Sequence, residues 1–318
     1  MAHTERFPLA LAHTAATLYY LQEATQAEIA ERIGTSRATV SRLLREARDR
    51  GLVRIEVLPL PEQDPGDLAE KVRVALGLRE VRLCPPTSEA HVVEAVSPTV
   101  SAVLAGLGLS AGDVLLVSSG RTLHEIAERE LPSLTGVVVV PMVGGQDEPE
   151  PWYQTNEITR RVAAAVGGTP RFLHAPAFPG RRLRRSLVED PEFRRFTGLW
   201  ADARCALMGV GAPPLRRASL PGFVPTGEAP LAGAVGDVAS RFYDASGAEI
   251  TYEGADRLIA IPLDVLARVP VRIAVAYGAL KVPSIVAGAR GGHFTHLVTD
   301  PATASALLTT TPDPLEGQ

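Results

Sequence analysis

The chain has 318 residues, of which 46% are hydrophobic, and its formal net charge is -4 at pH 7. This composition can fill one small and one large domain, and it argues against a disordered chain and against a nonspecific polycation. The two cysteines, Cys84 and Cys205, form neither a disulfide framework nor a zinc-ligand cluster, which indicates a reducing compartment.

The N-terminal residues are mildly apolar and lack the basic start of a signal peptide. No apolar run reaches the roughly 18 residues of a membrane span. We therefore expect a cytoplasmic protein with no membrane partner.

The first predicted element is a helix whose apolar side consists of Leu9, Leu11, Ala15, Leu18 and Leu21.

Two further helices follow closely. Thr25 precedes QAEIAERIG and has Glu28 three residues later, which is a capping box, and Gly34 ends that helix. Ser36 then begins SRATVSRLLREARDRG, which Gly51 ends. Its predicted buried stripe consists of Val40, Leu43, Leu44 and Ala47. Two helices joined by so few residues indicate a helix-turn-helix.

The face opposite this stripe carries arginines and hydroxyls, and in a helix-turn-helix the first half of the second helix enters the major groove. Arginine can bond guanine O6 and N7 with two donors. Leu52–Leu58 resembles a wing strand. We therefore predict a winged helix-turn-helix in residues 1–58 that binds double-stranded operator DNA through Thr25, Gln26, Ser36, Arg37, Ala38, Thr39, Ser41, Arg42, Arg45 and Arg54.

Residues 59–80 are predicted to be a linker and a connecting helix, because PLPEQDPGD is rich in proline and Leu68–Leu76 is periodic. Residues 81–318 then alternate apolar runs with amphipathic stretches, which favours a doubly wound, mostly parallel α/β domain. The predicted strands are Asp113–Ser118, Gly136–Pro141, Arg171–His174, Ala203–Val210, Arg257–Ile261 and Val271–Ala276. The predicted helices between them include Leu123–Leu131, Asn156–Val166 and Leu280–Ala289.

The segment YYLQEATQAEIAERIGTSRATVSRLLREARDRGLVRIEV resembles the N-terminal domain of the SorC family of bacterial sugar-responsive regulators. The resemblance continues through SSGRTL, VVPMVGG, TNEI, GAVGDVASRFYDASG and AYGALKVPSIVAGARGGHFTHLVTDPATASALL, and so spans nearly the whole chain. It implies a C-terminal domain related to sugar-phosphate isomerases that senses a small sugar or sugar phosphate. It also implies a homo-oligomer, a tetramer built as a dimer of dimers. Separately from the resemblance, we expect no cofactor and no metal.

The effector site is expected where loops follow buried strands, because glycine-containing turns there hold anions and sugar oxygens. Ser118, Ser119, Gly120, Arg121 and Thr122 match the family's effector loop. Further contacts are expected from Gly144, Gly145 and Gln146, and from Asn156, which as a helix cap would have a structural use instead. By the resemblance, the acidic position of the site is Asp237 and its phosphate-binding lysine is Lys281.

Several alternatives stay open at this stage. Val143 stands where some relatives that bind phosphorylated sugars carry arginine, so a neutral sugar remains possible. The basic run Arg181–Arg195 is expected to be a solvated or subunit-contacting face. An isomerase or deaminase would need a carboxylate or histidine near its substrate, but the candidates are scattered: His124, Asp237, His293 and His296. A regulator that binds DNA constitutively without a ligand is the other alternative.

Overall fold

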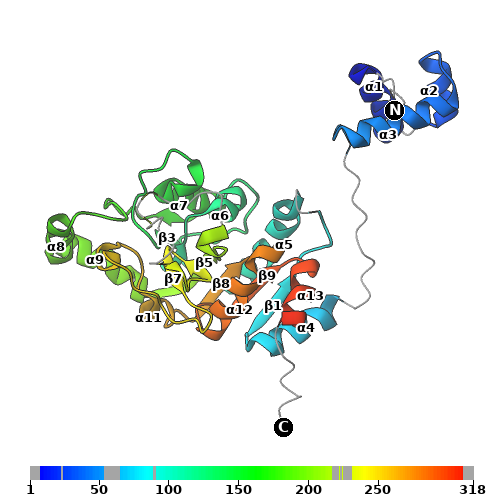
Figure 1. Ribbon diagram of the computed structural model, residues 1–318. Coiled ribbons are helices and arrows are strands. Elements are labelled where there is room, and N and C mark those ends of the chain that lie inside the picture. The colour runs from blue at the N-terminus through cyan, green and yellow to red at the C-terminus, as the bar shows by residue number, and fades with distance from the viewer. Residues whose placement is uncertain are drawn as a thin grey trace, which may run out of the picture. The chain divides into compact units, whose positions relative to one another are not determined.

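The computed structural model describes residues 8–22, 24–53, 65–88, 91–216, 222, 224 and 231–310. The chain divides into two compact units, Met1–Pro59 and Leu60–Gln318, each described here by itself (Figure 1). The predicted wing strand from residue 54 onward, with Arg54, and the start of the linker lie outside the described residues. Within the described ranges no helix is long and apolar enough to cross a bilayer.

The first unit contains the three predicted helices, α1 (Leu9–Tyr20), α2 (Gln26–Arg32) and α3 (Arg37–Asp49). The capping box is confirmed, because the backbone N–H of Thr25 donates to the Glu28 carboxylate at 2.8 Å while the Glu28 N–H donates to the Thr25 hydroxyl. Gly34 and Gly51 follow α2 and α3 with φ of 66° and 71°, the left-handed conformation that ends a helix.

The predicted stripe of α3 is confirmed, since Val40, Leu43, Leu44 and Ala47 are all buried. The predicted apolar side of α1 is partly wrong. Leu9 and Leu21 are 48% and 80% exposed, and the buried side consists of Ala12, Ala15 and Ala16. Alanines face α3 because small side chains let two helices pack closely, and leucines at those positions would hold them apart.

The second unit is built on a seven-stranded sheet in the order β1-β9-β8-β5-β2-β3-β4, and every neighbouring pair in it is parallel. Its strands are β1 (Glu80–Leu83), β2 (Val114–Val117), β3 (Val138–Pro141), β4 (Thr169–Pro170), β5 (Ala203–Gly209), β8 (Val271–Val275) and β9 (His296–Thr299). This confirms the predicted mostly parallel α/β fold.

Helices cover both faces of the sheet, so alternate residues of one strand enter different cores. In β2, Val114 and Leu116 belong to one buried cluster, and Leu115 and Val117 belong to the other. The first cluster is completed by α4 (Pro65–Leu76), α9 (Pro191–Ala201), α12 (Val282–Arg290) and α13 (Pro301–Thr310). The second is completed by α5 (Val92–Gly106), α6 (Arg121–Ile126) and α7 (Thr155–Val166).

The remaining helical elements are α8 (Arg181–Glu189) and several short turns. Helix α8 has no buried residue and precedes α9 directly (Figure 1). Short turns of helix are η2 (Pro151–Tyr153), η3 (Pro214–Arg216), η4 (Ala255–Arg257), α11 (Leu263–Leu266) and η5 (Ala279–Lys281).

Two predicted strands are wrong, and one hairpin was not predicted. Residues 171–174 are irregular, and 257–261 form no strand beyond the single bridge of Ala260 to Val143. Strands β6 (Gly236–Val238) and β7 (Arg241–Tyr243) pair antiparallel instead. Ala239 and Ser240 join them with φ of 48° and 65°, as a two-residue hairpin turn requires. Three-residue strands are too short to show a period in sequence.

The strand order reverses beside β2. From β2 the chain adds β3 and β4 on one side, and then returns to place β5, β8 and β9 on the other. The crevice outside the carboxyl ends of β2 and β5 is therefore the topological switch point, where open α/β sheets bind ligands. The loop after β2 contains five of the eleven predicted effector residues, Ser118 to Thr122.

Candidate DNA-binding and effector sites

The start of α3 is fixed by two of its predicted DNA-binding residues. The Ser36 hydroxyl accepts a hydrogen bond from the Thr39 N–H at 3.1 Å and lies 3.0 Å from the Thr39 hydroxyl. Ser36 is therefore the N-cap of α3. These hydroxyls orient the helix, and their contact with DNA stays a prediction.

The outer side of α3 is polar and accessible, as Arg37, Ala38, Ser41, Arg42 and Arg45 are all exposed. Within the part of the chain that the structure describes, Arg37 and Arg45 make no ion pair. Arg50 at the far end is paired with Glu46 at 2.6 Å. Among the described residues, Arg37 and Arg45 are therefore exposed cations of α3 without a paired carboxylate.

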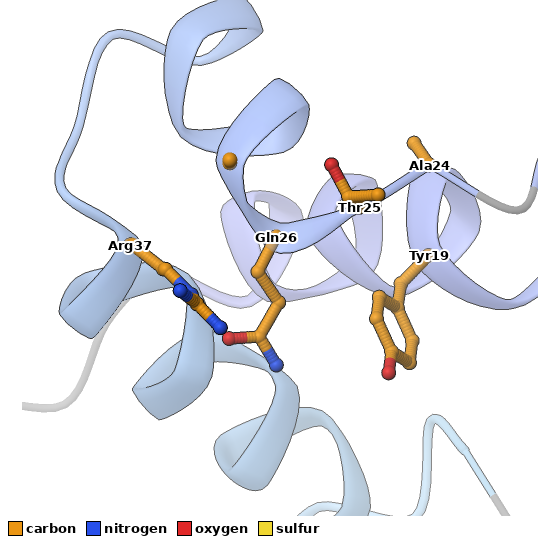
Figure 2. A pocket seen from close by; sticks show the side chains of 6 residues that line it. Tyr19, Ala24, Thr25, Gln26 and Arg37 are labelled. Carbon is orange, nitrogen blue, oxygen red and sulfur yellow. The ribbon is translucent and has the colours of Figure 1, made fainter.

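A hollow of about 730 Å³ lies where α2 and α3 begin, lined by Tyr19, Ala24, Thr25, Gln26, Ala27 and Arg37. Figure 2 shows the side chains of Gln26 and Arg37 reaching toward each other across it. The Thr25 hydroxyl is 2.9 Å from the Glu28 carboxylate and belongs to the helix cap. Thr25 and Gln26, at the start of α2, and Arg37, at the start of α3, thus line the same hollow. Sequence spacing alone did not show that these residues lie together.

In the second unit, residues 118–122 form the predicted effector loop between β2 and α6. The Ser118 hydroxyl donates to the Ser119 carbonyl at 3.0 Å and accepts from the Gly209 N–H at 3.2 Å. Ser118 is 2% exposed. Its side chain thus braces the ends of β2 and β5 at the switch point, and this structural use was not predicted.

Ser119 and Gln146 are brought together from two different loops. The Gln146 carboxamide nitrogen donates to the Ser119 hydroxyl at 3.1 Å, and Gln146 is 7% exposed. Its carboxamide oxygen is buried, with no hydrogen-bond partner in the described structure. A buried polar atom without a partner costs about 1–3 kcal/mol, so this oxygen favours a site for a ligand donor such as a sugar hydroxyl.

Gly120 and Arg121 are both in contact with Trp152 of η2. The Gly120 N–H donates to the Trp152 carbonyl at 2.8 Å, and the Arg121 guanidinium carbon lies 4.8 Å from the centre of the indole. Gly120 has φ of 123°, which only glycine adopts readily. Trp152 was missed because its contacts with the loop span some thirty residues of sequence, and no local pattern marks it.

Thr122 and Lys281 are linked through Tyr277, which also escaped the sequence analysis. The Thr122 hydroxyl is 3.4 Å from the Tyr277 hydroxyl, and the Lys281 ammonium lies 5.3 Å from the centre of the Tyr277 ring. Burial raises the pKa of Tyr277, so its phenol stays protonated and can donate. The segments that follow β2 and β8 are therefore in contact, although β5 lies between these two strands in the sheet.

The backbone of Gly144 and Gly145 is already bonded within the protein. Gly144 N–H donates to the Ile259 carbonyl at 2.9 Å, and Gly145 N–H donates to the Ala175 carbonyl at 2.8 Å. A Cβ on Gly144 would lie 2.7 Å from the Ala175 carbonyl oxygen. Glycine is needed there for close backbone packing, and an effector contact by either residue stays a prediction.

Asn156 and Asp237 also have structural partners. Asn156 is not the cap of α7, which is Gln154. Its carboxamide accepts from the Leu173 N–H and donates to the Leu173 carbonyl, both at 3.1 Å, and its contact with an effector stays a prediction. The Asp237 carboxylate accepts from the Ser240 N–H at 3.2 Å, and its carbonyl accepts from Gly211 N–H at 2.9 Å. Asp237 thereby lies just beyond the carboxyl end of β5.

The histidines considered for an enzyme lie apart from one another. His296 begins β9, at the amino end of a strand and so at the opposite edge from the effector loop. His293 bonds the Gly247 carbonyl, and burial lowers the pKa of both residues. His124 lies on α6, 3.7 Å from Glu128. The described structure does not group these side chains around one reacting position.

Gln146 offers a direct test of the effector site. Replacing it with leucine removes one hydrogen bond and one unpartnered oxygen, so we expect the free energy of unfolding to change by no more than about 1 kcal/mol. The same change should remove most of the stabilisation by a bound sugar. Thermal unfolding with and without ligand measures both effects. Undiminished ligand stabilisation would show that Gln146 does not contact the effector.

Family models divide the chain in the same way as its structure. A Crp-like helix-turn-helix domain matches residues 9–60, and a model described as "Putative sugar-binding domain" matches residues 62–309. The second match alone covers well over half of the chain.

Two curated relatives align over nearly their full length. The sorbitol operon regulator of Klebsiella pneumoniae is 29% identical over 308 residues, and the deoxyribonucleoside regulator of Bacillus subtilis is 32% identical over 311 residues. Each alignment covers 92% of this chain and 96% of the relative. The crystal structure of the full-length Klebsiella regulator superposes with a TM-score of 0.67 at 27% identity, covering 94% of this chain and 99% of that one.

Proposed function

This chain belongs to the SorC family of transcriptional regulators that carry a sugar-binding domain, and on that premise we propose that it controls a carbohydrate-metabolism operon. Its first unit binds the operator, and its second unit binds a small sugar or sugar phosphate that changes operator affinity. The observation that carries the proposal is the buried, unpartnered oxygen of Gln146 beside Ser119 in a chain that also exposes the cationic face of α3.

Operator binding is supported by the chemistry of α3. Its exposed arginines, Arg37, Arg42 and Arg45, can bond guanines or phosphates, while Ser36 and Thr39 hold the helix start. The hollow lined by Gln26 and Arg37 lies on the same unit, and we propose that a backbone phosphate binds there. The other predicted contacts are Thr25, Ala38, Ser41 and Arg54.

Effector binding is supported by contacts between the loops after β2, β3 and β8: Gln146 bonds Ser119, and Tyr277 contacts both Thr122 and Lys281. Ser119 and Gln146 supply bonding groups for hydroxyls, while Arg121 and Lys281 supply positive charge for a phosphate or another anion. The proposed site also includes Ser118, Gly120, Thr122, Gly144, Gly145, Asn156 and Asp237. We further propose that the chain acts in the cytoplasm as a homotetramer, a dimer of dimers, and that it is not an enzyme.

Thermal unfolding with a panel of sugars and sugar phosphates, together with operator binding, tests this function. A ligand that binds only the folded state at 100 times its Kd adds about 2.7 kcal/mol to stability. We expect one class of ligand to do so and to change operator affinity. If no ligand stabilises the chain while operator DNA is still bound, the constitutive regulator is the correct reading.

Substitutions of Thr122 and Lys281, which both contact Tyr277, test where the effector binds. Thr122→Ala and Lys281→Ala should each weaken effector binding, because each removes a bonding group from the proposed site. Operator affinity without effector should stay within about twofold, since neither residue lies in the DNA-binding unit. Titration calorimetry and gel-shift titrations give the two affinities. A full effector response in both variants would place the effector elsewhere.

A further inference from the structure

The turn η2 occupies groups that the proposed effector site would use. The Gly120 N–H bonds the Trp152 carbonyl at 2.8 Å, and the Arg121 guanidinium carbon lies 4.8 Å from the centre of the Trp152 indole. A donor and a cation of the effector loop are thus both engaged by one residue. While these contacts last, neither group is fully available to a ligand.

The segment that carries Trp152 is held at both ends. Before it, Gln146 bonds Ser119 at 3.1 Å, and Glu148 accepts a hydrogen bond from the Gly222 N–H. After it, the Gln154 carboxamide donates to the Glu148 carbonyl at 2.5 Å, and Thr155 begins α7. Trp152 is therefore positioned over the effector loop by its own short segment.

The cation–π contact of Arg121 with Trp152 is weaker than the hydrogen bond that Arg121 would make to an oxyanion of an effector. Arg121 is exposed and Trp152 is half-buried, and a cation–π contact at an exposed position contributes little. A charge-assisted hydrogen bond from arginine to an oxyanion is stronger and more directional. An oxyanion can therefore replace the indole as the partner of Arg121.

We infer that Trp152 is a gate residue of the effector site. In the unliganded chain it holds Gly120 and Arg121, and an oxyanion on the effector must displace it before these groups bind the ligand. The unpartnered oxygen of Gln146, which lies at the start of the same segment, independently indicates that a ligand enters beside this turn. The inference rests on the proposed effector-binding function. It adds that Trp152 and the effector compete for Gly120 and Arg121.

Tryptophan fluorescence reports the gate directly. The chain has two tryptophans, and Trp200 is buried with its indole N–H bonded to the Pro141 carbonyl. In a Trp200→Phe variant, titration with inorganic phosphate at constant ionic strength should shift Trp152 emission to longer wavelength, with saturation, as the ring loses its cation and meets water. If calorimetry detects phosphate binding but the emission of Trp152 does not change, the proposed gate is overturned.

Affinity measurements on the chain with both tryptophans intact give the second test. Removing the indole with Trp152→Ala should raise phosphate affinity about 2- to 30-fold, and Trp152→Phe should give a smaller gain. The control is Tyr153→Ala, since Tyr153 lies in the same turn and makes no hydrogen bond to the effector loop in the described structure. An equal gain in this control would mean that any loosening of the turn has the same effect.

The gate and the proposed function fail in different ways. Unchanged or weaker phosphate binding by Trp152→Ala overturns the gate, as does the absence of measurable phosphate binding in all these proteins. Operator DNA binding is measured on the same preparations. If operator DNA is still bound, the proposed function as a regulator is retained even though the gate is overturned. If the unsubstituted chain does not bind operator DNA, the proposed function itself is overturned.

Discussion

Replacing Arg42 with alanine is expected to weaken operator binding by about 5- to 150-fold, which corresponds to the roughly 1–3 kcal/mol of a bidentate contact with guanine. Arg42 is exposed on α3, one turn beyond Ala38, whose carbonyl accepts from its guanidinium at 3.5 Å. Because the side chain is exposed, its truncation should leave the fold intact. Gel-shift titrations at fixed salt measure the loss.

The matched control is Arg50→Ala, which removes the same charge from the end of α3. Arg50 is paired with Glu46 at 2.6 Å, so its contribution to the field at the start of the helix is already reduced. We expect this variant to lose much less affinity, and both variants to bind effector normally. Equal retention of operator by Arg42→Ala would contradict the assignment of α3 as the recognition helix.

Replacing Leu43 with alanine is expected to cost about 3–5 kcal/mol and to unfold the first unit at growth temperature. Leu43 is fully buried in a core made largely of alanines, with Ile29 and Leu44 among its few large side chains. A domain of this size has little stability to lose. Operator binding should disappear, while the second unit still unfolds cooperatively and still responds to effector.

Calorimetry and gel-shift titrations on the same variant check this separation of the two units. The control is Leu21→Ala, because Leu21 is 80% exposed at the end of α1 and its truncation removes almost no packing. We expect that variant to behave like the parent chain. If Leu43→Ala also abolished the effector response, the two units would not fold independently.

The sequence by itself determined the features that depend on neighbours along the chain. The Thr25–Glu28 box and the stripe of Leu43 and Leu44 were both predicted because helix caps and helical periodicity act within a few residues. The apolar runs of β2, β3, β5 and β8 predicted a sheet covered on both faces for a similar reason. Resemblance to the SorC family predicted residues 118–122 as the effector loop, and their contact with an effector stays a prediction.

Only the tertiary structure decided which distant groups meet. Whether leucine or alanine faced α3 depended on how closely two helices pack, and the use of Asn156 depended on Leu173 lying beside it. The contacts of Trp152 with Gly120 and of Tyr277 with Thr122 join loops that follow different strands. Strand order sets these pairings, and strand order arises from contacts between segments far apart in the chain, which local sequence patterns do not encode.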